Sequence, residues 1–225
     1  MASSTEIPTF PLKLSRQERK DQKERTKAFE KELRALAKGT GWRSAQGTLF
    51  RAQGDWFVSN LPTLAFQRGV VVRWTHKPMK IDPLFWSIFG LDENNKMPLS
   101  FRDQGAWTIR PATQQFYLSE DVTDPLKLAE DTLAYSNERL AEVEMLTIEN
   151  LLSEYEPFSS NKGMRRTIAV CLLLLVGREN EALELCGDGN DSGSVFDRDS
   201  GGFAHDNITF FDAARQWIIA NRVAT

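Results

Sequence analysis

The chain has 225 residues, of which 41% are hydrophobic, and its six Trp and fourteen Phe are enough to build a hydrophobic core, so a wholly disordered chain is excluded. Its net charge is only −3, but the charge is unevenly distributed. Residues 118–225 carry twenty Asp and Glu against nine Lys and Arg, whereas residues 1–41 and 42–117 each carry a basic excess of four, which predicts a strong field around a nearly neutral protein.

The N-terminal part predicts one long helix after a loose arm. Residues 1–14 include Pro8 and Pro11 and are expected to be flexible. Ser15 is a suitable N-cap for a helix that runs to about Lys38 and ends at Gly39. Its apolar residues lie late in the helix, and the segment from Arg16 to Lys27 is almost entirely charged, so the first half should be solvated and the second half docked.

Residues 42–117 have the pattern of short strands and contain five of the six tryptophans. Aromatic and β-branched residues favour four strands, at Thr48 to Arg51, Asp55 to Leu61, Val70 to His76 and Ala106 to Arg110. Gly54 sits at a predicted hairpin turn. These strands should form an antiparallel, aromatic-rich sheet.

Two Asp-Pro pairs predict helix starts, because Asp is a good N-cap and Pro fits the first helical position. Asp82 would open a short helix through Phe89. Asp124 would open a much longer one, whose apolar stripe reaches Tyr155 and which Pro157 stops. Residues 119–156 carry eleven carboxylates against two cations, so this long helix is expected to present a stiff acidic face.

The remaining chain predicts a helical hairpin, at Asn161 to Val176 and Arg178 to Cys186, then a polar Gly/Asp/Ser stretch at 187–202 and a last helix near Phe210 to Asn221. This order of elements predicts an α+β fold, with an N-terminal helix, an antiparallel sheet and a C-terminal helical layer. The predicted division is a flexible arm (1–14), a helix-plus-sheet domain (15–118) and an acidic helical region packed on it (119–225).

Catalytic motifs are scarce. His76 and His205 are the only histidines. His76 ends a predicted strand, and Asp82, six residues later, would be able to orient its imidazole in a hidden pocket. The favoured interpretation is that His76 is a polar residue at a strand end. Nucleophile-elbow and phosphate-loop motifs are absent. Cys171 and Cys186 are expected to be reduced and structural. The sequence therefore predicts no enzyme, no cofactor and no zinc site.

The segment 188–199 can be aligned to a helix-loop-helix calcium loop. Two features favour a flexible connector instead. The twelfth place holds Asp and not Glu, and Gly201-Gly202 breaks the chain where the exit helix should begin. The aligned ligand positions are Asp188, Asn190, Ser192 and Asp199, with Gly193 at the sharp turn and Val195 at the apolar eighth place.

An alternative function is nucleic-acid binding by the sheet of residues 42–117. Arginines and tryptophans together are the ingredients of phosphate contact and base stacking, although aromatic residues at this density in strands are mostly core. The residues concerned are Arg43, Arg51, Arg68, Arg73, Arg102, Arg110, Trp56, Trp74 and Trp107.

Three stretches, 80–91, 97–107 and 177–183, have a layout that resembles small bacterial proteins, some of which are immunity partners of secreted or contact-delivered toxins. The resemblance lies in packing motifs and carries over no functional residue. It implies a cytoplasmic, non-enzymatic binder that neutralises one toxin. The absence of a signal peptide and of an apolar run long enough to span a membrane agrees with a cytoplasmic location.

The sequence thus predicts an interaction protein whose acidic helix binds a basic partner, such as a toxin domain that acts on nucleic acid. The oligomeric state is not predicted. The candidate partner-binding residues are Glu130, Asp131, Glu138, Glu142, Glu149 and Glu154.

Overall fold

The computed structural model describes residues 14–65, 69–111, 114–118, 124–155, 163–187 and 204–223. The contacts divide the chain into two compact units, each made of two chain segments. One, here called the sheet unit, comprises Met1–His76 and Ala112–Glu144. The other, here called the helical unit, comprises Lys77–Pro111 and Met145–Thr225. The division predicted from the sequence stays a prediction.

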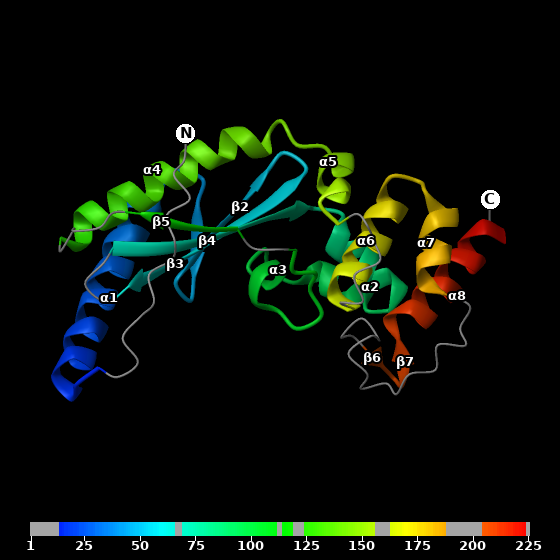
Figure 1. The fold of residues 1–225 in the computed structure, drawn as a ribbon, viewed down its shortest axis with the longest axis horizontal. Helices are drawn as coiled ribbons and strands as arrows, with labels where there is room; N and C mark the ends of the chain where they lie inside the picture. The colour runs from blue at the N-terminus through cyan, green and yellow to red at the C-terminus, as the bar shows by residue number, and fades with distance from the viewer. Residues whose placement is uncertain are drawn as a thin grey trace. The chain divides into compact units, whose positions relative to one another are not determined.

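The sheet unit combines five antiparallel strands in the order β1-β2-β3-β4-β5 with two long helices (Figure 1). The helices pack along each other and contact the sheet at β1 and β3. The elements are α1 (Arg16–Ala37), β1 (Arg43–Ala45), β2 (Thr48–Gln53), β3 (Trp56–Ala65), β4 (Gly69–Pro78), β5 (Gln114–Leu118) and α4 (Pro125–Val143).

Helix α1 confirms the prediction made from its sequence. The Ser15 side chain accepts a hydrogen bond from the backbone N–H of Glu18, whose carboxylate accepts one from the Ser15 N–H in return. This capping box satisfies two backbone donors at the helix start. Phe29, Leu33 and Ala37 are buried, whereas the cations of the first half are exposed except Arg25, which is partly buried, so mainly the second half docks in the core.

The predicted hairpin is also confirmed. Gln53 pairs with Trp56 across a two-residue turn, in which Gly54 has a φ of 54°, a left-handed conformation that glycine adopts without strain. In β4, Val72 and Trp74 are buried and Arg73 is exposed, as the two-residue period of a strand requires.

The predicted strand at Ala106 to Arg110 is wrong. Its backbone groups bond to side chains instead of to a neighbouring strand. The carbonyl oxygen of Trp107 accepts from Trp86 Nε1 at 2.5 Å, and the N–H of Ile109 donates to Asp82 at 2.9 Å. Trp107 also has a φ of 62°, which interrupts an extended run. The edge strands β1 and β5 were not predicted.

The helical unit has a core of aromatic and aliphatic side chains. Phe85 is completely buried, and its ring stacks on Phe210 at 5.5 Å. Helix α6 packs on α2, α5 and α7, and α8 packs on α2 and α7. The elements are α2 (Ile81–Ile88), η1 (Asp92–Lys96), α3 (Phe101–Gln104), α5 (Ile148–Ser153), α6 (Gly163–Leu175), α7 (Glu179–Cys186), β6 (Ala204–His205), β7 (Ile208–Thr209) and α8 (Phe210–Val223).

The single long helix predicted between Asp124 and Tyr155 is instead two helices, α4 and α5. Thr147 has extended backbone dihedrals and caps α5, because its hydroxyl accepts from the N–H of Asn150 while the Asn150 side chain accepts from the Thr147 N–H. A capping box of this kind starts a new helix. The Asp124 cap and Pro125 start were predicted correctly.

The helix order and the antiparallel sheet confirm the predicted α+β class. The helical hairpin of α6 and α7 and the last helix α8 also lie where the sequence predicts them. The N-terminal arm up to residue 13, Pro157 and the segment 188–199 lie outside the described residues.

Candidate functional site

Helix α4 gathers four of the six predicted partner-binding residues on one side. At 100° per residue, these four span an arc of about 120°, and the opposite side of α4 buries Leu128, Thr132 and Leu140. Three of the four are exposed, and Asp131 is partly exposed. This surface, here called the acidic face, consists of Glu130, Asp131, Glu138 and Glu142.

Two of these carboxylates have a cationic partner on the same helix. Asp131 pairs with Lys127, and Glu142 pairs with Arg139; the hydrogen bond to Asp131 raises the pKa of Lys127. Within the described residues, Glu130 and Glu138 make no ion pair. The acidic face therefore offers two carboxylates that a cationic partner would be able to bind without breaking an existing pair.

The acidic face also contains apolar surface. Leu126, in the first turn of α4, is 42% exposed. Ala134 and Ala141 are exposed between the carboxylates. Protein interfaces combine apolar contact with charged groups near the rim. The mixture of carboxylates and apolar surface therefore fits a protein partner better than a partner that binds by charge alone.

Glu149 and Glu154 are not brought into this face. Both are exposed, on α5 and at its C-cap, and α5 belongs to the helical unit whereas α4 belongs to the sheet unit. Their expected grouping with the α4 carboxylates depended on one continuous helix, which the Thr147 cap interrupts. The acidic face is therefore smaller than the sequence predicts.

His76 packs in the sheet unit as a structural side chain. Its ring contacts Trp56 edge-on at 5.9 Å, and its buried Nε2 makes no hydrogen bond to any described group. Burial lowers the pKa of His76 from its usual 6.5, the positive charge of Arg139 lowers it further, and Glu142 opposes the shift. The lowered pKa keeps the imidazole neutral at pH 7.

The lowered pKa of His76 predicts how stability depends on pH. The unfolded chain binds a proton near pH 6.5 and the folded chain binds it only at lower pH, so the free energy of unfolding should fall as the pH drops below about 6.5. His76→Gln should flatten this dependence. Urea denaturation of both proteins at pH 7.5 and 5.5 measures the two slopes, and parallel slopes would contradict the assignment.

Asp82, which the sequence assigned to a helix cap or to orienting His76, is part of a buried ion cluster instead. Its carboxylate is completely buried, 2.9 Å from Lys77 Nζ and 3.2 Å from Arg102 Nη1. It also accepts from the N–H of Ile109. Lys77 Nζ further donates to the carbonyl oxygens of Arg102 and Ile109, at 2.7 Å each. Burial lowers the pKa of Lys77, while Asp82 opposes that shift.

The buried ion cluster of Lys77, Asp82 and Arg102 is a structural feature that the sequence did not reveal. Lys77 shares the strand parity of exposed Arg73, so the alternation of β4 would place it in solvent. Its full set of hydrogen bonds joins the end of β4 to α2, α3 and the segment at 108–111. Saturated hydrogen bonding of this kind is typical of a buried polar network that stabilises a fold.

The two cysteines are free and buried, as predicted. Burial raises the pKa of Cys171 well above its usual value and that of Cys186 to about 12. Since the thiolate is the reactive form, neither thiol is a nucleophile at neutral pH.

Two of the three tryptophans that the nucleic-acid alternative uses lie in the core, and Trp107 is half-buried. Trp56 and Trp74 are only 7% and 2% exposed, so neither ring is available to stack on a base. Arg102 is engaged in the buried ion cluster, whereas Arg43, Arg73 and Arg110 are exposed. Arg68 lies outside the described residues.

No group of three or more metal-ligating side chains occurs within the ranges that the structure describes. Among the same residues, no helix is both long and apolar enough to traverse a bilayer. No protein-family model, curated protein or solved structure matches this chain.

Proposed function

We propose that this protein is a non-enzymatic binding module that acts in the cytoplasm and inhibits a basic partner protein through its acidic face. The observation that supports this proposal is the pair of exposed carboxylates, Glu130 and Glu138, which have no ion-pair partner in the described structure and lie on the same side of α4. Exposed Leu126 lies one helical turn before Glu130. A toxin that acts on nucleic acid needs a basic surface for its substrate. Occlusion of that surface by carboxylates would block it.

The alternative, recognition of nucleic acid by the sheet, has less support. Base stacking requires accessible aromatic rings, and Trp56 and Trp74 are in the core. Replacement of exposed Arg73 is the clean test of that alternative, because Arg102 has a structural role in the buried ion cluster. An inhibitor that acts through the acidic face should tolerate Arg73→Gln.

Charge reversal on the acidic face should slow association with the partner. The double variant Glu130→Lys/Glu138→Lys should lower the association rate constant roughly tenfold at low salt, because long-range attraction accelerates the encounter of oppositely charged surfaces. The partner is captured on the immobilised wild-type protein from host lysate, eluted by salt, identified and produced in pure form. Association rates are then measured by surface plasmon resonance at several salt concentrations.

A matched control variant, Asp55→Lys/Asp92→Lys, changes the net charge equally at exposed positions that are not part of the acidic face. Its association rate should stay close to that of the wild type. Equal slowing by both variants, or a wild-type rate that does not depend on salt, would contradict a role for the acidic face. Circular dichroism checks that each variant remains folded.

A further inference from the structure

Helix α1 carries a row of cations along its full length that the proposed inhibitor function does not use. All its members are exposed and recur every three or four residues, so that at 100° per residue they lie within an arc of about 80°. This surface, here called the basic stripe, consists of Arg16, Lys20, Lys23, Lys27, Lys31, Arg34 and Lys38.

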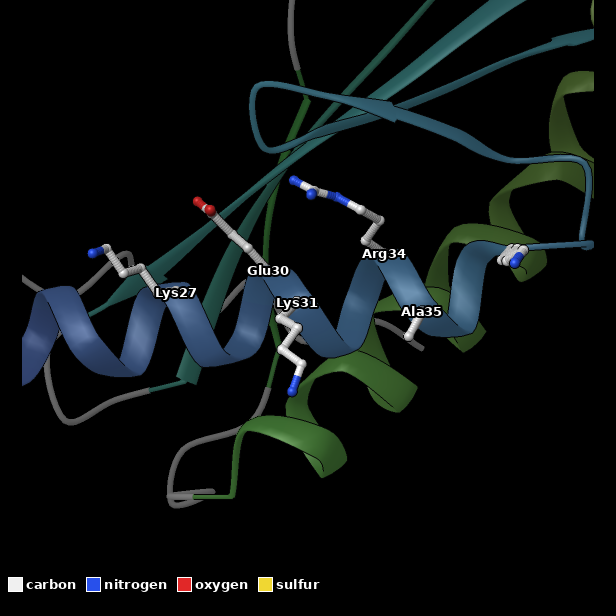
Figure 2. Close-up of a pocket in the computed structure, with 6 residues that line it drawn as sticks. Lys27, Glu30, Lys31, Arg34 and Ala35 are labelled. Carbon is white, nitrogen blue, oxygen red and sulfur yellow. The ribbon is translucent and has the colours of Figure 1, made fainter.

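Part of the basic stripe lines an open depression on α1, bounded by Lys27, Glu30, Lys31, Arg34, Ala35 and Lys38. Figure 2 shows Lys31 and Arg34 projecting to opposite sides of the helix axis, with Lys27 and Glu30 on the side of Arg34. Glu30 is the single acidic residue among the six that line the depression. An elongated anion lying along α1 would therefore meet cations on both sides.

The cations of the basic stripe are almost without acidic partners. Within the described residues, the one ion pair is a 4.0 Å contact between Lys31 and Glu32, and the Lys31 side chain is 83% exposed. Like charges three or four residues apart destabilise a helix by about 0.2–0.5 kcal/mol per pair. The basic stripe repeats this unfavourable arrangement along the whole helix, and a bound polyanion would relieve it.

The composition of the basic stripe distinguishes between possible partners. None of the exposed large hydrophobic residues lies on α1, whereas protein interfaces use aromatic or aliphatic anchors and are depleted in Lys. A membrane-surface helix inserts its apolar face into lipid, but Phe29 and Leu33 of α1 are 1% and 2% exposed in the protein core. A straight, anchor-free row of cations instead suits a line of phosphates.

We propose that the basic stripe binds the phosphate backbone of duplex DNA without reading its sequence. Single strands are held largely by stacking of their bases on aromatic side chains, and the exposed side of α1 has none. A duplex presents phosphates and needs no stacking. From Arg16 to Lys38 the basic stripe extends over about 33 Å, which is the length of about ten base pairs.

The test is a salt titration with a 20-base-pair DNA duplex of arbitrary sequence, measured by fluorescence anisotropy on the full chain. If four to seven cations contact phosphates, the slope of log K against log salt should lie between about −4 and −6. Lys20→Gln/Lys27→Gln/Lys31→Gln should make this slope shallower by about 3 and weaken binding by about 100-fold or more at 0.1 M salt.

The matched control, Lys80→Gln/Lys96→Gln/Lys127→Gln, removes the same charge from exposed lysines outside the basic stripe. It should keep the wild-type slope. Three outcomes would each overturn the proposal. They are an equal loss of duplex affinity in the control, a wild-type slope shallower than about −2, and stripe-dependent binding to phosphatidylserine vesicles with no binding to the duplex. The acidic-face variant Glu130→Lys/Glu138→Lys should still bind DNA, so this proposal and the inhibitor proposal fail independently.

Discussion

Asp82→Ala is expected to lower the free energy of unfolding by about 3–5 kcal/mol, the cost of removing one partner from a buried ion pair. Lys77 and Arg102 would lose their shared carboxylate, and the Lys77 side chain is only 2% exposed. The Ile109 N–H would lose its acceptor as well. Urea denaturation followed by far-UV circular dichroism measures the change.

A double-mutant cycle separates the ion pair from simple loss of packing. Lys77→Met with Asp82→Leu removes both charges, so its cost should be smaller than the sum of the two single costs by about 1–3 kcal/mol. Asp82→Ala alone would then lower the free energy of unfolding more than replacement of the pair by apolar groups of similar size. Additive single and double effects would show that the 2.9 Å contact between Lys77 and Asp82 contributes no coupling.

Trp74→Ala should destabilise the sheet unit by about 3–5 kcal/mol, because it leaves a cavity where a large core side chain was. Trp74 is 2% exposed and packs edge-on against Trp42, with ring centroids 6.2 Å apart. Trp42 in turn donates from Nε1 to Asn137 on α4 at 2.9 Å. The cavity would therefore loosen the contact between the sheet and α4.

Arg73→Ala is the control for Trp74→Ala, since Arg73 is the neighbouring residue of β4 and is exposed. Its effect should lie within about 0.5 kcal/mol of zero. The slope of the unfolding free energy against urea concentration should be the same in both variants and the wild type. An unchanged slope means that the loss in Trp74→Ala is a change in stability and not a change in the unfolded state. A loss below about 1 kcal/mol for Trp74→Ala would mean that the site collapses to fill the cavity.

Much of the secondary structure was readable from local signals. Ser15 before a charged run, Gly54 between two strand patterns and Asp124 before Pro125 each mark a boundary that the structure confirms. Each of these signals acts within a few residues through a cap or a turn, so it operates before any tertiary contact forms. The same kind of signal occurs at Thr147, whose capping box with Asn150 starts α5.

The candidate site was only partly predictable. Glu130, Asp131, Glu138 and Glu142 share a face because helical period alone places them there. Glu149 and Glu154 belong to the other unit. The cations of α1 also follow from period, but their exposure along the whole helix required knowing which side Phe29 and Leu33 bury.

The α+β class, most helix boundaries and the separation of acidic from basic segments follow from local sequence, because these depend on caps, turns and residue period. Three features appear only in the folded protein. Lys77 and Asp82 form a buried ion pair, and residues 106–110 bond to side chains instead of forming a strand. Residues 77–111 also share a unit with residues after 144. Lys77 and Asp82 are only five residues apart, but their burial and the other two features depend on segments far away in the chain, such as those that contain Arg102 and Ile109. Local pattern carries no signal for such contacts.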